Sequence, residues 1–125
     1  MKILLPIITR EENSDAFLDM ATTNADNVIL LLVIDTSEMP AWQFGFAAGE
    51  IMQGTDFLED LKKSVGKRKK SAVEITEWGN TVSKIAHIAE LQNVDKIVLK
   101  KGKTHYWKEL LKKLEGATSK KIEII

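Results

Sequence analysis

Continuous apolar runs alternate with amphipathic stretches along this chain, and the run within Lys2–Arg10 sets the pattern. Such a run predicts a strand that is covered on both faces, as in the centre of a parallel sheet. Val28–Ile34 repeats this pattern, whereas Ala72–Trp78 alternates with period two and suits an outer strand. Asp95–Leu99 and Lys121–Ile125 complete a set of five predicted strands.

A predicted helix follows each of the first four strands. The first has Asn13 or Ser14 as its N-cap and turns Phe17, Met20 and Ala21 toward the sheet. This alternation of strand and helix predicts an α/β fold: a single-domain, open parallel sheet over residues 1–125, with helices on both faces and right-handed crossovers.

The later helices are bounded by clear signals. The second begins at Ala47 or Gly49, is interrupted by Gly54, and ends in the basic cluster 67–70, where cations suit a helix C-terminus. The third follows Gly79. The fourth is strongly amphipathic and ends at Gly116 as a C′ glycine; its apolar positions are Trp107, Leu110, Leu111 and Leu114.

Composition narrows the possible functions. The chain has no cysteine and two histidines, which excludes disulfides and argues against a thiolate or multi-histidine metal site. No apolar run is long enough to span a membrane, and the start of the chain has no signal-peptide layout, so a cytoplasmic protein is expected. Residues 1–60 carry two basic and eleven acidic residues, and the excess is reversed in 61–125. The lysines of 67–70 need no nucleic acid to explain them, and none is expected.

The segment from Thr36 to Gly49 is the least regular part of the chain. Its aromatic residues Trp42, Phe44 and Phe46 allow two interpretations: a lid over a pocket or partner surface, or a loop that closes the core.

Several segments in order resemble the universal stress protein family, and the likeness covers nearly the whole chain. The matching pieces are 3–7 for the first strand, 12–14 and Ala21 for the first helix, 32–35 for the end of the second strand, 77–80 with Ile85 and Ala86 for the glycine turn, and 94–99 for the fourth strand. The resemblance implies a Rossmann-like sheet of order 3-2-1-4-5 and often a dimer built on the fifth strand.

The ATP-binding motif of that family is missing at two places. ATP-binding members resemble V-P-x-D at the end of the first strand, and here Ile8 takes the place of the aspartate. They also carry G-x2-G-x9-G-[ST] after the fourth strand, where glycines let backbone N–H groups cradle phosphates. Here Lys100 replaces the first glycine, only Gly102 remains before Gly116, and the segment is too short. ATP is therefore not expected as a cofactor, and no other cofactor is predicted.

Cationic residues gather instead beyond the first and fourth strands. The set is Arg10, Lys100, Lys101, Lys103 and His105. Beside a helix N-terminus, such groups could hold a phosphate or carboxylate by charge alone. The alternative is a solvated lysine turn with nothing bound.

Two functional hypotheses follow, and catalysis is not favoured. The first is a non-enzymatic, dimeric domain with a stress-response or regulatory role. The second is a sensor that binds an anionic or nucleotide-like molecule in the crevice beyond strands one and four. The sequence has no G-x-S-x-G nucleophile elbow and no H-E-x-x-H helix. A homodimer is expected through Ile122–Ile125, because an apolar edge strand recruits another chain.

Overall fold

The computed structural model describes residues 1–9, 11–37 and 47–125, the side chains of 47–51 excepted. The strands are β1 (Lys2–Pro6), β2 (Asn27–Asp35), β3 (Ser71–Gly79), β4 (Lys96–Leu99) and β5 (Lys121–Ile124). The helices are α1 (Asp15–Ala21), α2 (Ala47–Gly66), α3 (Thr81–Leu91) and α4 (His105–Ala117). All five predicted strands and all four predicted helices are present.

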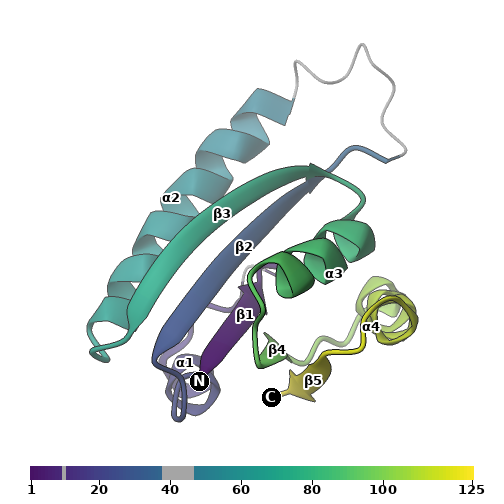
Figure 1. Cartoon of the computed structure of the whole chain (residues 1–125). Helices are drawn as coiled ribbons and strands as arrows, with labels where there is room; N and C mark the ends of the chain where they lie inside the picture. Colours follow the sequence, from purple (N-terminus) through teal and green to yellow (C-terminus); the bar gives the residue numbers. More distant parts are fainter. Residues whose placement is uncertain (10, 38–46) are drawn as a thin grey trace.

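The strands form one parallel sheet in the order β3-β2-β1-β4-β5 (Figure 1). This order confirms the fold class, with β3 as one outer strand and β5 as the other. β1 pairs with β2 at five positions, from Lys2↔Asn27 to Pro6↔Leu31. It pairs with β4 at only two, Ile3↔Lys96 and Leu4↔Ile97. The strand order reverses on either side of β1, and ligands of open α/β sheets bind at such switch points.

Two apolar layers explain the continuous runs in the central strands. Alternate residues of β2, such as Val28 and Leu30, pack with Phe17 of α1 and Leu61 of α2. The residues between them pack with α3 and α4 on the opposite face. Figure 1 shows α1 and α2 behind the sheet and α3 and α4 in front of it. Because both faces are covered, neither set of side chains can be polar.

The predicted inner face of α1 is partly wrong. Ser14 is the N-cap, as one of the two predicted candidates, and its side chain accepts a hydrogen bond from the Phe17 N–H. Phe17 and Ala21 are buried, but Met20 is 62% exposed and Leu18 is fully buried instead. α1 has only seven residues. In so short a helix, the 3.6-residue period does not distinguish a face through 17, 18 and 21 from one through 17, 20 and 21.

The two glycines singled out within helices both have a different role from the predicted one. α2 continues through Gly54, where an added Cβ would overlap with Cδ2 of Leu32. The glycine therefore lets helix and sheet approach closely. Gly116 does not end α4, which continues to Ala117 and stops at Thr118. Thr118 has an extended backbone and donates its N–H to the Leu114 carbonyl, so no left-handed glycine is needed.

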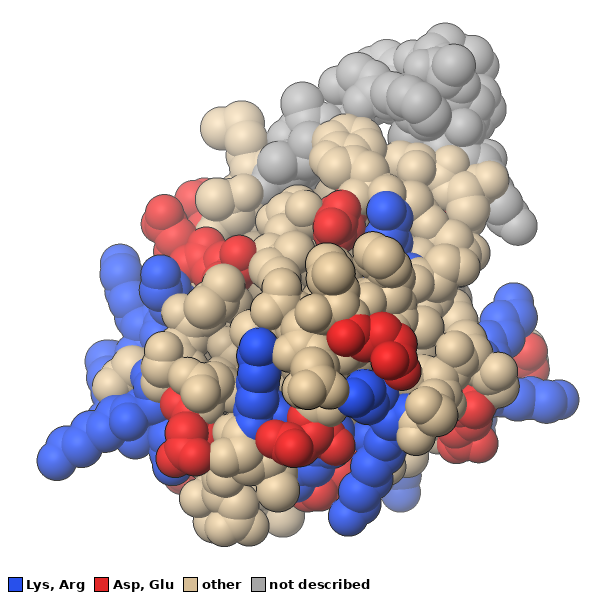
Figure 2. All heavy atoms as spheres, in the orientation of Figure 1, with Lys and Arg blue, Asp and Glu red and all other residues tan. Residues whose placement is uncertain are grey.

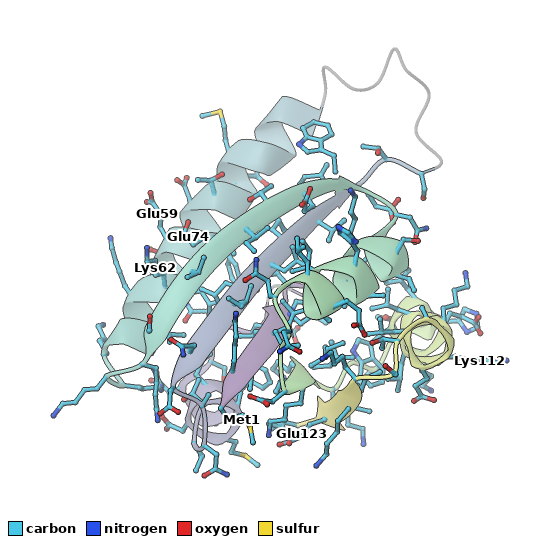
Figure 3. All side chains as sticks on the ribbon, viewed as in Figure 1. Met1, Glu59, Lys62, Glu74, Lys112 and Glu123 are labelled. Carbon is cyan, nitrogen blue, oxygen red and sulfur yellow. The ribbon has the colours of Figure 1, made fainter. Side chains whose placement is uncertain are left out.

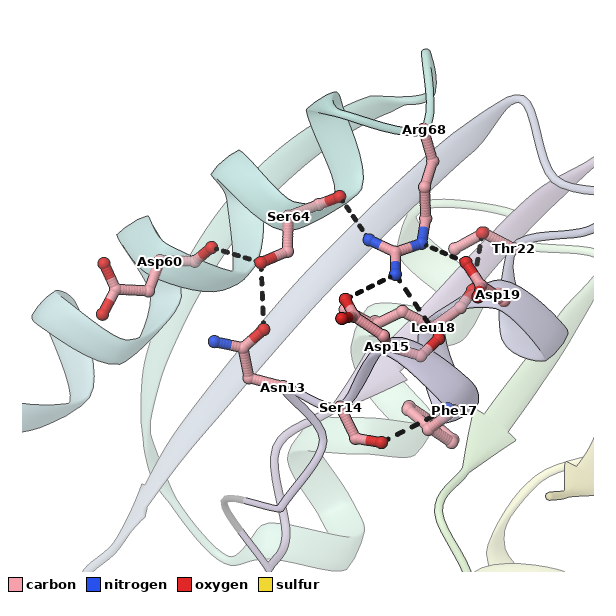
Figure 4. Close-up of polar contacts among 10 residues, drawn as sticks. All are labelled: Asn13, Ser14, Asp15, Phe17, Leu18, Asp19, Thr22, Asp60, Ser64 and Arg68. Atoms are coloured by element: carbon pink, nitrogen blue, oxygen red, sulfur yellow. Dashed lines mark hydrogen bonds and ion pairs between the residues drawn. The ribbon is translucent and has the colours of Figure 1, made fainter.

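Arg68 connects the end of α2 to α1 (Figure 4). Its Nη2 lies 2.9 Å from Oδ1 of Asp15, and its Nε lies 2.8 Å from Oδ1 of Asp19. Its Nη1 donates to the Ser64 carbonyl, and the Ser64 hydroxyl donates to Asn13. One member of the basic cluster 67–70 therefore has a structural role on the α1–α2 face of the sheet.

Charges of both signs are interspersed on the face seen in Figure 2. The opposite charge balances of the two halves of the sequence thus do not separate into two patches there, because interleaved elements place both halves on one surface. Figure 3 labels Glu59 and Lys62 on α2 and Glu74 on β3, so both halves of the sequence contribute charged side chains to these elements. In the part of the chain that the structure describes, no helix is long and apolar enough to cross a membrane.

Candidate functional site

Three neighbouring cavities lie over the carboxyl ends of β1 and β2 and the first turns of α3 and α4. The first, of about 190 Å³, is lined mainly by residues that end β1 and β2. The second, of about 240 Å³, lies between α3 and α4. The third, of about 450 Å³, lies between the turn after β1 and the start of α4. Tyr106 lines all three, and we refer to them together as the crevice.

The first and second cavities share Asp35, the last residue of β2. Its Oδ2 accepts hydrogen bonds from the Thr81 N–H and hydroxyl, at 3.1 and 2.8 Å. Its Oδ1 accepts from the Ser37 N–H and hydroxyl, at 3.0 and 2.6 Å. Burial acts against ionisation, but the Ser37 and Thr81 hydrogen bonds outweigh it and hold the pKa of Asp35 below its ordinary value. Asp35 is therefore an ionised carboxylate that joins β2 to the start of α3.

Among the described residues, the cationic side chains predicted from sequence do not all line one cavity. Lys103 lines the third cavity, but Lys100 and Lys101 line none of the three. Lys101 continues the β4–β5 pairing by donating its N–H to the Ile125 carbonyl. The His105 side chain is 87% exposed, with Nε2 3.9 Å from Oε1 of Glu109. Arg10 lies outside the described residues, as does the aromatic segment with Trp42, Phe44 and Phe46.

The Trp107 side chain packs against the segment between β4 and α4. Its side chain is buried, and an added Cβ on Gly102 would lie only 2.6 Å from its Cγ. Thr104 is the N-cap of α4, and its hydroxyl accepts the Trp107 N–H at 3.1 Å. Trp107 Nε1 is buried and has no hydrogen-bond partner among the described residues. The amphipathic pattern predicts that Trp107 is buried, but it cannot show that the indole fills the space beneath Gly102.

Glu12 is a second residue whose position the sequence does not reveal. An acidic residue just before a helix is expected to be solvated near the helix N-terminus, yet Glu12 is fully buried. Its Oε2 accepts hydrogen bonds from the turn after β1, and its Oε1 has no partner among the described residues. Glutamate is rarely fully buried, so a reading of the sequence alone does not predict that Glu12 is buried.

Metal ligands are not clustered in the described ranges 1–9, 11–37 and 47–125. No group of three or more histidine, aspartate or glutamate side chains there is arranged to hold an ion. The crevice is lined by three carboxylates, Asp35, Glu109 and Glu11, and by two lysines, Lys103 and Lys113. Tyr106 and Trp107 are its aromatic lining residues.

Comparison with known proteins places the chain in a family. The model of the universal stress protein family matches residues 1–122. The chain belongs to the universal stress protein family. This membership confirms the resemblance drawn from the sequence and agrees with the observed strand order. No curated protein matches the chain.

Solved structures of universal stress proteins and related proteins share this fold. Hypothetical protein MJ0577 is 24% identical with a TM-score of 0.83, and the match covers 99% of this chain and 94% of that one. Universal stress protein UspA from Lactobacillus plantarum is 16% identical with a TM-score of 0.80, covering 100% and 97%. The protein from Archaeoglobus fulgidus in complex with dAMP is 12% identical with a TM-score of 0.78, covering 100% and 97%. At these identities the likeness shows the fold alone.

Proposed function

We propose that this protein is a non-enzymatic universal stress protein domain that acts as a homodimer in a stress-response or regulatory role. In this proposal it does not bind ATP through a glycine loop. The observation that carries the proposal is the packing of Trp107 against Gly102 after β4. A glycine in a phosphate-binding loop leaves room for the ligand, whereas here the close approach at Gly102 is used by an indole ring.

The carboxylates at the same edge of the sheet support a non-enzymatic role. A general base needs a carboxylate oxygen within hydrogen-bond reach of the substrate proton. Both oxygens of Asp35 already accept hydrogen bonds from Ser37 or Thr81. Glu12 is fully buried and bound to the turn after β1. These two carboxylates are therefore engaged by the chain itself, whereas Glu11 and Glu109 line the crevice without such a bond to the sheet edge among the described residues.

Titration calorimetry tests the absence of ATP binding. Adding ATP with Mg²⁺ to the folded wild-type protein should give no saturable heat. Circular dichroism of the same sample checks that the protein is folded. Stoichiometric ATP binding would contradict the proposal, and its loss in a Trp107→Phe variant would place the nucleotide against the indole.

A second function, as a sensor of an anionic or nucleotide-like molecule, is supported by the third cavity. Lys103 lines this cavity beside the first turn of α4, where backbone N–H groups favour anions. The Archaeoglobus fulgidus relative in complex with dAMP has the same fold. A ligand held here would rely on Lys103 and the helix terminus in place of a glycine loop.

Thermal-shift measurements with AMP and inorganic phosphate test the sensor function. Binding should raise the melting temperature of the wild type through mass action. A Lys103→Ala variant should lose most of that shift. Lys112→Ala is the matched control, since Figure 3 shows this lysine pointing away from the sheet on the same helix. The sensor function fails if no ligand shifts the wild type or if both variants respond alike.

The dimer is proposed to form at the free edge of β5. Ile124 is 41% exposed there, whereas Ile122 and Ile125 pack against the protein's own core. Ile124 is therefore the residue to change. Light scattering should give a dimer for the wild type and a monomer for Ile124→Lys. Val73→Lys, on the opposite edge strand, should remain dimeric; a monomeric wild type would refute the proposal.

A further inference from the structure

The turn after β1 is folded around a carboxylate of the chain itself. Glu12 Oε2 lies 3.1 Å from the Ile8 nitrogen and 3.0 Å from the Thr9 nitrogen. The Thr9 hydroxyl lies 3.1 Å from the same oxygen. Three donors, two of them successive backbone N–H groups, thus converge on one oxygen of a side chain that is fully buried.

Successive backbone N–H groups that point to one centre form a concave site for anions. Hydrogen bonds from such groups to an ionised carboxylate are short and about twice as strong as those between neutral groups. None of the ion pairs found among the described residues includes Glu12. Backbone dipoles and one hydroxyl therefore hold the carboxylate within the described part of the chain.

The same turn forms one wall of the crevice. Ile8 lines the first and third cavities, and Thr9 lines the third. On the opposite side of the third cavity stand Lys103 and Thr104. The donors that hold Glu12 thus belong to residues that an external ligand in the crevice would touch.

We infer that the turn at Ile8 and Thr9 is a carboxylate-binding site, and that the protein fills this site with Glu12. The site takes a small planar carboxylate, because its donors converge on one oxygen and the carboxylate is enclosed. While Glu12 occupies it, the charged partner that the described residues offer to an external anion in the third cavity is Lys103. A ligand carboxylate reaches the β1 side only by displacing Glu12 from the turn.

Rescue by an external carboxylate tests this inference. A Glu12→Ala variant leaves the three donors without an acceptor and should melt at a lower temperature than the wild type. Formate should raise its melting temperature by more than it raises that of the wild type. Glu11→Ala is the matched control, since Glu11 is exposed and its side chain makes no hydrogen bond to this turn among the described residues; the substitution keeps the backbone N–H that donates to the Thr9 hydroxyl. Sodium chloride at the same ionic strength separates specific binding from a salt effect.

Equal responses of the three proteins to formate, or equal responses of Glu12→Ala to formate and chloride, would overturn the inference. If Glu12→Ala does not fold, the amide proton resonances of Ile8 and Thr9 provide a second test. In the wild type both should lie downfield, and both should move upfield in Glu12→Gln, whose neutral amide is a weaker acceptor than a carboxylate. Amide resonances of Ile8 and Thr9 that are the same in both proteins would also overturn it.

Discussion

Replacing Trp107 with alanine is expected to reduce the free energy of unfolding by about 3–5 kcal/mol, as for other large aromatic residues in a core. Trp107 is only 5% exposed and begins the apolar face of α4. Its loss would leave a void beneath Gly102 next to the third cavity. Urea unfolding followed by circular dichroism measures the change directly.

Two neighbouring substitutions make the Trp107 measurement specific. Tyr106→Ala removes the adjacent aromatic side chain, which is 58% exposed, and should have a much smaller effect. Trp107→Phe keeps an apolar ring and removes the buried Nε1, which lacks a partner among the described residues. It should therefore retain more stability than Trp107→Ala. Equal losses at 106 and 107 would show that the indole does not support the fold in the way described.

A single methyl group at Gly102 should destabilise the protein by about 1–3 kcal/mol, the range for overpacking in a filled core. The added Cβ would lie 2.6, 2.8 and 2.9 Å from Cγ, Cδ1 and Cβ of Trp107. These atoms lie close to the backbone of α4, so a rotation of the side chain alone cannot clear them. Chemical denaturation of Gly102→Ala against the wild type gives the difference.

At Gly116 the same glycine-to-alanine substitution should change the free energy of unfolding in the opposite direction. It lies inside α4, and a Cβ there would meet nothing within 4 Å. Gly116→Ala should therefore raise stability by up to about 1 kcal/mol, because alanine has the higher helix propensity. If both variants changed stability in the same direction, the crowding at Gly102 would not be the cause.

The fold could be predicted because its signals repeat over whole elements. The unbroken apolar runs around Ile3 and Val28 can be covered only by helices on both faces, and the alternation in 72–78 suits an edge strand. These patterns depend on many side chains at once, so one unusual residue does not obscure them. The strand order itself came from the family resemblance.

Single-residue predictions were less secure, because one side chain's partners lie far away in sequence. Gly116 looks like a C-terminal glycine, but whether a helix stops there depends on Thr118 and the start of β5. Gly102 looks like the remnant of a loop, and its close contact with Trp107 emerges only in three dimensions.

The candidate site shows the same division. Charge drew attention to the segment before α4, and of the lysines there only Lys103 lines one of the three cavities. Tyr106 lines all three cavities but carries no sequence signal, because an exposed tyrosine on a helix is ordinary. The burial of Glu12 could not be predicted, because local composition does not show that a carboxylate is buried.

The uneven pairing of β1 has a consequence for how the crevice could accommodate a large ligand. β1 pairs with β2 along its full length but with β4 at two positions only. The third cavity lies between the turn after β1 and the start of α4. The β1–β4 pair has the fewest paired positions of any two neighbouring strands in the sheet. A ligand too bulky for the third cavity would therefore meet the least resistance between β1 and β4.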